Sequence, residues 1–332
     1  MPVVRYLITK ARPEPPDHYK PTTDNYPLSS RGMKILITGS NGLLGQKLIG
    51  ALRNDSGVQL IATSRGLDRS AEPLGDRYRP MDIAVRAEVD AVVDAARPDV
   101  IIHAAAMTNV DACELDPEAC RLQNVVATEN LVQAAKRCGS HFIFLSTDFI
   151  FDGEKGPYRE EDAPAPLSVY GHSKLEGERI VQESGLERWA IARTIIVYGT
   201  APGLSRSNVV LWAKDALEKG TPIKVVDDQW RMPTLAEDLA DGCIRIAKRG
   251  TTGIYHLSGP DGMSILELVQ RTGAFFGLST DHVSAVKSAS LGQPAKRPPH
   301  TGFILDKARR DLGYAPRGFE AGLAVLRGQL AQ

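Results

Sequence analysis

The chain of 332 residues is 42% hydrophobic and 24% charged, which is enough to build one large α/β domain or two smaller ones. Lys and Arg together number 40, as do Asp and Glu, so the formal net charge is zero. A balanced charge argues against the strong field that recruits nucleic acid or an anionic membrane surface.

Two further features of the composition bear on location and metal binding. No apolar run approaches the roughly 20 residues that span a bilayer. The four cysteines are widely spaced, with no CxxC pair and no histidine at zinc spacing: Cys113, Cys120, Cys138 and Cys243. This pattern predicts reduced structural thiols, a cytoplasmic protein and no metal centre.

The first 32 residues differ from the rest of the chain. They hold six prolines and show no sustained hydrophobic period, so we expect residues 1–32 to form a disordered extension. From residue 33 to 198, short apolar runs alternate with helical patterns, which predicts a Rossmann-type, doubly wound parallel sheet. The expected strands are 34–38, 58–63, 99–104, 141–146 and one near 189–195.

A glycine-spaced turn directly follows the first expected strand. In Thr38-Gly39-Ser40-Asn41-Gly42-Leu43-Leu44-Gly45, the first glycine allows a tight turn and the second lets the backbone approach a pyrophosphate. The third lets the new helix pack close to the strand, and the helix N-terminus adds free N–H groups. The dinucleotide-binding residues expected here are Gly39, Asn41, Gly42, Leu43, Leu44 and Gly45.

The end of the second expected strand indicates which dinucleotide binds. An acid at this point would select NAD through the ribose 2′-hydroxyl, but the strand ends in Ser64 and Arg65. The forked guanidinium of Arg65 suits a 2′-phosphate, and Ser64 can donate beside it. We therefore expect NADPH as the cofactor. The alternative is that Arg65 is a solvated loop residue.

Two later strand ends are expected to complete the cofactor site. After a third strand, Asp82 would accept from the adenine amino group and Ile83 would cover the ring, although a plain loop aspartate fits equally well. After the next strand come Ala104, Ala105 and Ala106. Their small side chains would let the cofactor ribose and nicotinamide lie against the backbone. The alternative is that they are small residues required only for packing.

Tyr170 and Lys174 are four residues apart, so on a helix they share one face. An ammonium beside the phenol, together with the positive nicotinamide of the oxidised cofactor, is expected to lower the pKa of Tyr170. In the reductive direction Tyr170 would give its proton to a carbonyl oxygen. Thr147, at the end of a strand, would hydrogen-bond the same oxygen. The alternative, an ordinary tyrosine with a surface lysine, is disfavoured because both residues follow the dinucleotide fingerprint.

Beyond residue 199 the regular alternation loosens. Shorter helices are expected at 209–219, 235–248, 264–276 and 306–312, between turns rich in Gly and Pro. We expect residues 199–332 to form mainly a smaller C-terminal α/β domain that binds substrate, with segments that return to the domain of residues 33–198.

These motifs, in this order, resemble the extended short-chain dehydrogenases/reductases, and within them the dTDP-4-dehydrorhamnose reductase group. The matching segments are HAAAMTNVD at 103–111, STDFIFDG at 146–153, YGHSKLEGE at 170–178, Arg193-Thr194 with Tyr198-Gly199, and Asp228-Gln229 with Pro233-Thr234. The resemblance implies reduction, by NADPH, of a 4-keto group on a deoxysugar carried by a nucleoside diphosphate. It further implies that Thr108 and Val110 border the sugar, that Lys174 holds the nicotinamide ribose and that Arg297 faces the diphosphate. A homodimer remains open.

Two positions depart from that group. Phe149 and Ile196 stand where its members usually have a tyrosine and a tryptophan beside the sugar. Both changes remove groups that would line a deoxysugar pocket, so reductase chemistry is better supported than a rhamnose substrate. Phe149 also stands where a 4,6-dehydratase would carry a catalytic glutamate, so dehydration is disfavoured. The cation at Arg65 argues against an epimerase with tightly held NAD.

A second resemblance points to a protein without a reaction of its own. Residues 157–167 and 228–234 are also similar to the regulatory β subunit of methionine adenosyltransferase, which keeps the fold and the NADP site but serves as a partner subunit. An NADP-binding regulatory subunit is therefore the alternative function. Substrate turnover would separate the two.

Overall fold

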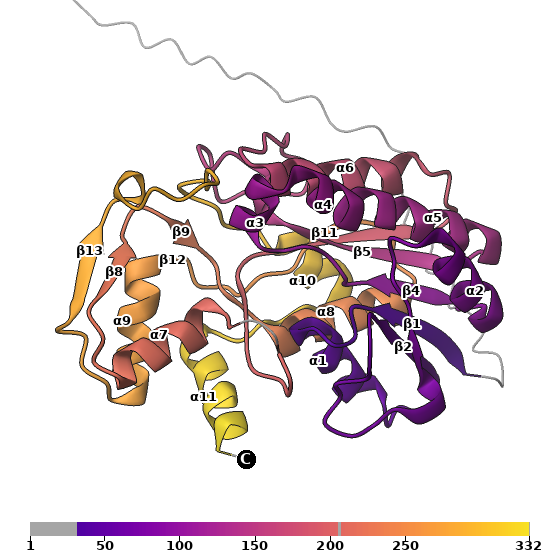
Figure 1. Ribbon diagram of the computed structural model, residues 1–332, viewed down its shortest axis with the longest axis horizontal. Helices are drawn as coiled ribbons and strands as arrows, with labels where there is room; N and C mark the ends of the chain where they lie inside the picture. The colour runs from indigo at the N-terminus through magenta and orange to yellow at the C-terminus, as the bar shows by residue number, and fades with distance from the viewer. Residues whose placement is uncertain (1–31, 205–206, 332) are drawn as a thin grey trace, which may run out of the picture.

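A computed structural model describes residues 32–204 and 207–331 of the chain (Figure 1). The disordered extension expected at residues 1–32 lies, apart from Gly32, outside the described residues.

Seven parallel strands form the central sheet, in the order β11-β6-β5-β4-β1-β2-β3. They are β1 (Met33–Thr38), β2 (Val58–Ser64), β3 (Tyr78–Pro80), β4 (Val100–His103), β5 (His141–Thr147), β6 (Trp189–Thr194) and β11 (Gly253–His256). The strand order reverses between β1 and β4, and in sheets of this kind ligands bind beyond the carboxyl ends of the strands at such a point. The predicted doubly wound parallel sheet is confirmed.

Two helical layers cover the sheet because successive residues of a strand face opposite sides. Ile35 and Ile37 of β1 share one core cluster with residues of α1 (Leu43–Leu52), α8 (Ala236–Arg249) and α10 (Asp306–Leu312). Leu36 shares the other with residues of α2 (Arg86–Ala96), α5 (Ala127–Cys138) and α6 (Val169–Glu183). Figure 1 shows the layer of α2, α5 and α6 above the sheet and α1 with α8 below it.

Short helical elements occupy several of the connections between the longer helices and strands. They are α3 (Val110–Leu115), α4 (Pro117–Arg121), a π-helical turn (Leu122–Val126) and the 3₁₀ turns at Gly75–Arg77, Asp148–Ile150 and Ser288–Ser290. Asn109 caps α3 by accepting from the Ala112 N–H at 3.2 Å, and Asp116 caps α4 by accepting from the Ala119 N–H at 3.0 Å. These caps fix where the loop after β4 turns back toward α6.

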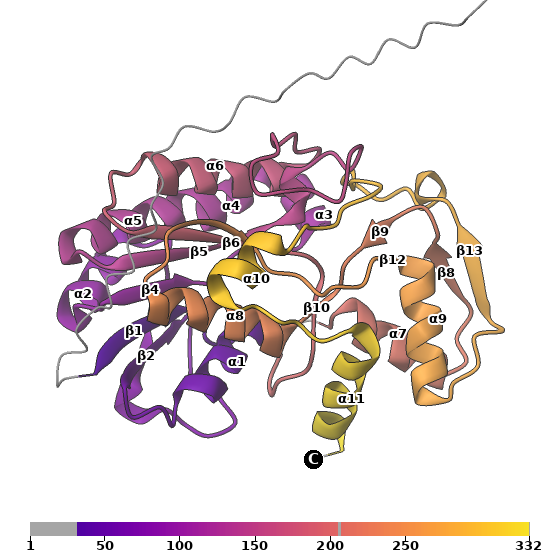
Figure 2. The same cartoon turned by 180° about the vertical axis from the view of Figure 1, so that it is seen from behind.

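A smaller α/β unit follows the main sheet in the chain and lies to one side of it (Figure 2). Its strands pair as β7 (Val197–Tyr198) with β10 (Thr234–Leu235), β9 (Trp230–Arg231) with β12 (Met263–Ser264), and β8 (Ile223–Val226) with β13 (Val283–Val286). Its helices are α7 (Val209–Glu218), α9 (Ile265–Phe276) and α11 (Phe319–Leu330). α8 and β11, although later in the chain, pack on and extend the main sheet. The division at residues 198 and 199 stays a prediction.

The structure bears on the thiols, the membrane segments and the metal sites considered from composition. Cys113, Cys120, Cys138 and Cys243 are all free thiols. Within residues 32–204 and 207–331, no helix combines the length and the apolar character that a membrane crossing needs. The same residues contain no group of three or more His, Cys, Asp or Glu placed to share a metal ion.

Candidate active site

The glycine turn between β1 and α1 is built so that side chains would not fit. Gly39 has a φ of 70°, and a Cβ there would lie 2.8 Å from the backbone N of Ala105. A Cβ on Gly45 would lie 2.3 Å from the Gly39 carbonyl oxygen. Gly42 begins α1 without a side-chain cap, so the first N–H groups of the helix face the turn. This backbone cradle has the form that binds a pyrophosphate.

Asn41 connects the glycine turn to the loop that follows β2. Its side-chain amide donates to the Leu67 carbonyl at 2.9 Å and its oxygen accepts from the Arg69 N–H at 2.9 Å. Leu43 and Leu44 begin α1, and Leu44 packs against the core on the α1 side of the sheet. Asn41 therefore holds the glycine turn and the loop after β2 together.

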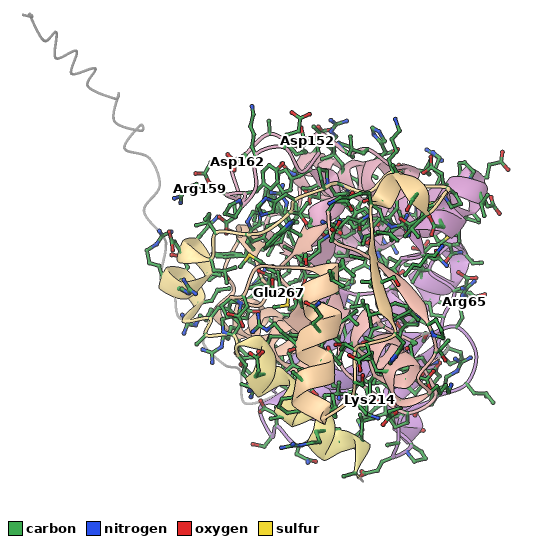
Figure 3. All side chains as sticks on the ribbon, turned by 90° about the vertical axis from the view of Figure 1, so that its left-hand side faces the viewer. Arg65, Asp152, Arg159, Asp162, Lys214 and Glu267 are labelled. Carbon is green, nitrogen blue, oxygen red and sulfur yellow. The ribbon has the colours of Figure 1, made fainter. Side chains whose placement is uncertain are left out.

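Arg65 and Asp82 lie together beyond the ends of β2 and β3. The Arg65 guanidinium is 4.0 Å from the Asp82 carboxylate, and its side chain is 67% exposed. Figure 3 shows Arg65 at the rim of the molecule, pointing outward. Ser64 is the last residue of β2 and its carbonyl accepts from the Met81 N–H at 3.0 Å. The predicted 2′-phosphate side and adenine side of the cofactor are thus adjacent.

Ile83 and the three alanines lie at the neighbouring strand ends. The Ile83 side chain belongs to the core cluster with Leu36 and is only 6% exposed. Its side chain therefore offers little surface to an adenine ring, and contact would come mainly through its backbone. Ala104, Ala105 and Ala106 are half-buried after β4, and the Ala105 N–H donates to the Thr38 hydroxyl at 3.3 Å.

The three residues predicted to carry the chemistry lie at the junction of β5 and α6. Thr147 ends β5, and Ser168, two residues before Tyr170, caps α6 by accepting from the Gly171 N–H at 3.2 Å. The Thr147 side chain lies near the Tyr170 phenol and acts to lower its pKa. The Lys174 ammonium lies 4.0 Å from the centre of the Phe144 ring, a cation–π distance. All three side chains are buried.

The pKa values at this centre differ from the expectation drawn from sequence. Burial raises the pKa of Tyr170, because it disfavours the phenolate, and the neighbouring Asp148 charge acts in the same direction. Burial also lowers the pKa of Lys174 to about 7, because it disfavours the ammonium. In the chain by itself the phenol is therefore held neutral, and the expected lowering of its pKa by Lys174 is not seen.

A buried ionic network beside Thr147 has no counterpart among the residues assigned from sequence. Asp148 accepts from the Thr147 hydroxyl at 3.1 Å and from the Thr301 hydroxyl, and it lies 3.6 Å from the Arg231 guanidinium. Arg231 also donates to the Pro298 carbonyl at 2.7 Å. An acid inside the apolar run FLSTDFIF is a signal for Asp148. Nothing local marks Arg231 or Thr301, which come from distant parts of the chain.

Asn124 is a second residue without a role assigned from sequence. It lies in the π-helical turn, where its side chain accepts from the Met107 N–H at 2.8 Å and donates to the Met107 carbonyl at 3.0 Å. It also donates to the Ser173 hydroxyl at 2.9 Å. π-turns of this kind are frequent at functional sites. Asn124 therefore ties the loop after β4 to the catalytic helix α6.

The residues expected to border the substrate come from four segments. Thr108 is exposed and Val110 half-buried at the start of α3. Arg297 donates to Asp111 at 2.7 Å, so the C-terminal segment is tied to α3 next to Val110. This contact holds the pKa of Asp111 below its usual range.

Phe149 and Ile196, the two departures, pack in different clusters, and only Phe149, like Val110, packs against the cluster that contains Tyr170. The Phe149 ring meets Tyr170 edge-on at 5.8 Å. Ile196 has a φ of 34°, a rare conformation for a β-branched residue, and it packs against the cluster that contains Leu175 of α6. Strained residues of this kind gather at functional sites.

Known proteins with similar sequences include dTDP-4-dehydrorhamnose reductases and the beta subunit of methionine adenosyltransferase 2. Residues 33–331 match the family model of the RmlD substrate binding domain. Methionine adenosyltransferase 2 subunit beta of Xenopus tropicalis is 34% identical over 266 residues, which cover 79% of this chain and 77% of that protein. dTDP-4-dehydrorhamnose reductase of Streptomyces griseus is 33% identical over 281 residues, which cover 82% and 86%.

A solved structure adds the cofactor of a relative. The crystal structure of dTDP-4-dehydrorhamnose reductase from Bacillus anthracis, in complex with NADP, is 27% identical, with a TM-score of 0.77 over 90% of this chain and 99% of that one. The chain belongs to the RmlD substrate-binding domain family. Both resemblances predicted from its motifs are confirmed.

Proposed function

We propose that this protein is an NADPH-dependent reductase of a 4-keto group on a nucleotide-linked deoxysugar, similar to dTDP-4-dehydrorhamnose reductase. The observation that carries the proposal is the gathering of Thr147, Tyr170 and Lys174 at the end of β5, at the carboxyl edge of the sheet that also carries the glycine turn. Relatives that share this fold over most of their length are named as reductases of this type, and one contains NADP.

The residues at the sheet edge fit NADPH. The turn at Gly39 and Gly45 has no room for side chains, which lets a pyrophosphate approach the backbone. Arg65 is exposed beside it and would meet the 2′-phosphate, and Lys174 would hold the nicotinamide ribose. Bound there, NADPH would supply a hydride to the substrate carbonyl carbon.

In the proposed reaction Tyr170 gives its proton to the carbonyl oxygen as the hydride arrives. A phenol whose pKa is raised by burial remains protonated at neutral pH, which suits a proton donor. Lys174, one turn further along α6, would stabilise the phenolate that is left. Thr147 would hydrogen-bond the same carbonyl oxygen and fix its orientation.

The proposed substrate pocket is less polar than that of a typical rhamnose-forming reductase. Phe149 offers an aromatic ring without a hydroxyl, and Ile196 offers an aliphatic surface without a stacking face. Thr108 and Val110 would border the sugar, and Arg297, held by Asp111, would meet the diphosphate. The small-molecule partner is therefore a nucleotide sugar, in the cytoplasmic setting predicted from the cysteines.

The test is oxidation of NADPH by the full chain with freshly generated dTDP-4-keto-6-deoxy-L-mannose, followed by the loss of NADPH absorbance. Rapid turnover would support both the reaction and the substrate. Turnover only with other nucleotide-linked keto-sugars would keep the reaction and replace the sugar, as Phe149 and Ile196 allow.

A regulatory subunit is the second candidate, because several relatives are named methionine adenosyltransferase 2 subunit beta. On that reading, NADPH binds tightly and no keto-sugar is reduced. Absence of turnover with every nucleotide-linked keto-sugar, together with tight NADPH binding, would favour it over the reductase.

A further inference from the structure

A cavity of about 410 Å³ lies between the loop before α6, strand β9 and the segment that leads into α10. A volume of this size can hold a small molecule. Thr147, Tyr170 and Lys174, all within the described residues, do not line it. Figure 3 shows Arg159, which lines the cavity, and Arg65, which marks the predicted cofactor side, at opposite edges of the molecule. The cavity is therefore separate from the site assigned to the reaction.

A layer of two extended segments separates this cavity from the buried Asp148. Strand β9 runs beside the segment at His300, where the Thr301 N–H donates to the Trp230 carbonyl at 3.1 Å. Successive residues of an extended segment face opposite sides. Arg231 and Thr301 contact Asp148 on one side of the layer. Trp230 and His300 lie on the other side and line the cavity.

An exposed indole forms much of the apolar wall. Trp230 is 42% exposed, and its ring lies 6.0 Å from the ring of His300, with the two planes inclined by 48°. Met232 follows on the same side of β9, and its sulfur accepts from the Phe303 N–H at 3.1 Å. A flat aromatic ring in the cavity would cover this surface, because aromatic groups gain by packing against one another.

Two arginines bring positive charge to the same cavity. Arg159 lies 3.8 Å from Asp306, and both side chains are more than half exposed. Arg309, three residues after Asp306, is exposed and forms no ion pair within the part of the chain that the structure describes. Two guanidinium groups thus share the cavity with one carboxylate. The fork of a guanidinium suits a planar anionic group, which it can hold by two hydrogen bonds.

We propose that this cavity is a second ligand site, which takes a small aromatic anion. The ring of the ligand lies against Trp230 and His300, and its anionic group is held by Arg309 together with Arg159. The site goes beyond the proposed function and does not depend on it, since neither the reductase nor the regulatory subunit requires this cavity to be filled.

The test titrates 2-naphthoate into the full chain by calorimetry, with saturating NADPH to keep the probe out of the cofactor site. We expect a Kd of about 0.1 mM or tighter, as is reasonable for a ligand of this size. 2-Naphthamide has the same rings without the charge and should bind at least about tenfold more weakly. No binding of 2-naphthoate, or equal binding of the amide, would overturn the proposal.

Substitution of Arg309 locates the anionic end of the probe. Arg309→Gln should weaken 2-naphthoate binding at least about tenfold, because the guanidinium has no other partner to give up. Its side chain is exposed, so the variant is expected to fold. Arg310→Gln is the matched control: Arg310 is the next residue, is also exposed, pairs with Asp311 and does not line the cavity. An equal loss in Arg310→Gln would contradict the assignment.

Substitution of Trp230 locates the ring of the probe. Trp230→Leu keeps an apolar side chain and should weaken binding about fivefold, while Trp212→Leu, at a tryptophan that is 40% exposed on α7, should leave binding unchanged. Arg297→Gln, on the side assigned to the substrate diphosphate, should also leave binding unchanged. A loss in Arg297→Gln as large as that in Arg309→Gln would place the probe in the substrate cleft and overturn the proposal.

Discussion

Burial acts in opposite directions on the two residues at the reaction centre. A phenol is neutral when protonated and an amine is neutral when deprotonated, so the same apolar surroundings raise the pKa of Tyr170 and lower that of Lys174 to about 7. Neither residue is held in its charged form by the protein alone. A phenolate formed in the reaction would be stabilised by Lys174 in its protonated form and, when it is bound, by the oxidised nicotinamide.

Substitution of Arg65 tests whether this residue selects NADPH over NADH. Because its exposed guanidinium lies beside the glycine turn and near Asp82, we expect Arg65→Asp to weaken NADPH binding at least about tenfold and NADH binding far less. Titration of cofactor fluorescence with both dinucleotides measures this. Arg179→Asp, an exposed charge reversal on α6, serves as the control. Equal losses for NADPH and NADH in Arg65→Asp would show that Arg65 does not meet the 2′-phosphate.

Local motifs predicted the residues that lie close together in sequence. Tyr170 and Lys174 are one helical turn apart, and Thr147 ends a strand. The helical period and the order of the motifs along the chain were therefore sufficient to predict that these three residues lie together. Arg231 and Thr301 reach the same centre from distant segments, and no spacing rule could place them beside Asp148. Ile83 was expected to face the adenine ring, but its side chain packs into the core cluster with Leu36.

Among the elements, the turn between β1 and α1 gives the sharpest steric prediction. A Cβ on Gly45 would lie 2.3 Å from the Gly39 carbonyl oxygen, so Gly45→Ala must shift α1 away from β1. We expect a loss of about 1–3 kcal/mol in the free energy of unfolding and at least about tenfold weaker NADPH binding. Denaturant unfolding and cofactor titration measure the two effects.

Gly50 is the matched control on the same helix. A Cβ there meets nothing within 4 Å, so Gly50→Ala should leave NADPH binding unchanged and stabilise the chain by about 0.5–1 kcal/mol. If Gly45→Ala behaved like Gly50→Ala, the close approach of α1 to β1 would not matter for the site.

The periodic elements were predicted well because burial on both faces gives parallel strands short apolar runs. The expected strand 141–146 corresponds to β5, and the expected helix 264–276 corresponds to α9. The π-helical turn at Leu122–Val126 and the three two-stranded pairs of the C-terminal part were not predicted. Pairs of two to four residues carry too little pattern to be read from sequence alone.

Across the whole molecule, buried histidines make stability depend on pH. Burial lowers the pKa of His103 to about 3, that of His141 to about 4, and that of His256 below its usual range. As the pH falls below about 6.5, the unfolded chain takes up protons that the folded chain does not, so stability is lost. Each histidine contributes at most about 1.4 kcal/mol per pH unit.

His141 offers a test of this dependence. The Tm of the wild type should fall between about pH 6.5 and 5, and His141→Gln should show a shallower fall because one of the three titrations is removed. His172→Gln, on the exposed side of α6, should keep the wild-type slope. Identical slopes in His141→Gln and the wild type would contradict the account of the buried histidines.

The architecture links the two parts of the chain at the reaction centre. Alternation of strands and helices predicted the main sheet, since each strand follows the last by a regular crossover. The return of β11 to the edge of that sheet, and of Arg231 and Thr301 to Asp148, depends on how the smaller unit folds back. Such long-range contacts are set by packing of the whole chain.

The most direct test of the central claim compares the wild type with Tyr170→Phe, using saturating NADPH and freshly generated dTDP-4-keto-6-deoxy-L-mannose. Loss of the general acid should lower turnover at least about a hundredfold while the Kd for NADPH stays nearly unchanged. Tyr158→Phe, which changes another buried tyrosine, should turn over like the wild type. Turnover by Tyr170→Phe at the wild-type rate would contradict the assignment of this residue and of the site built around it.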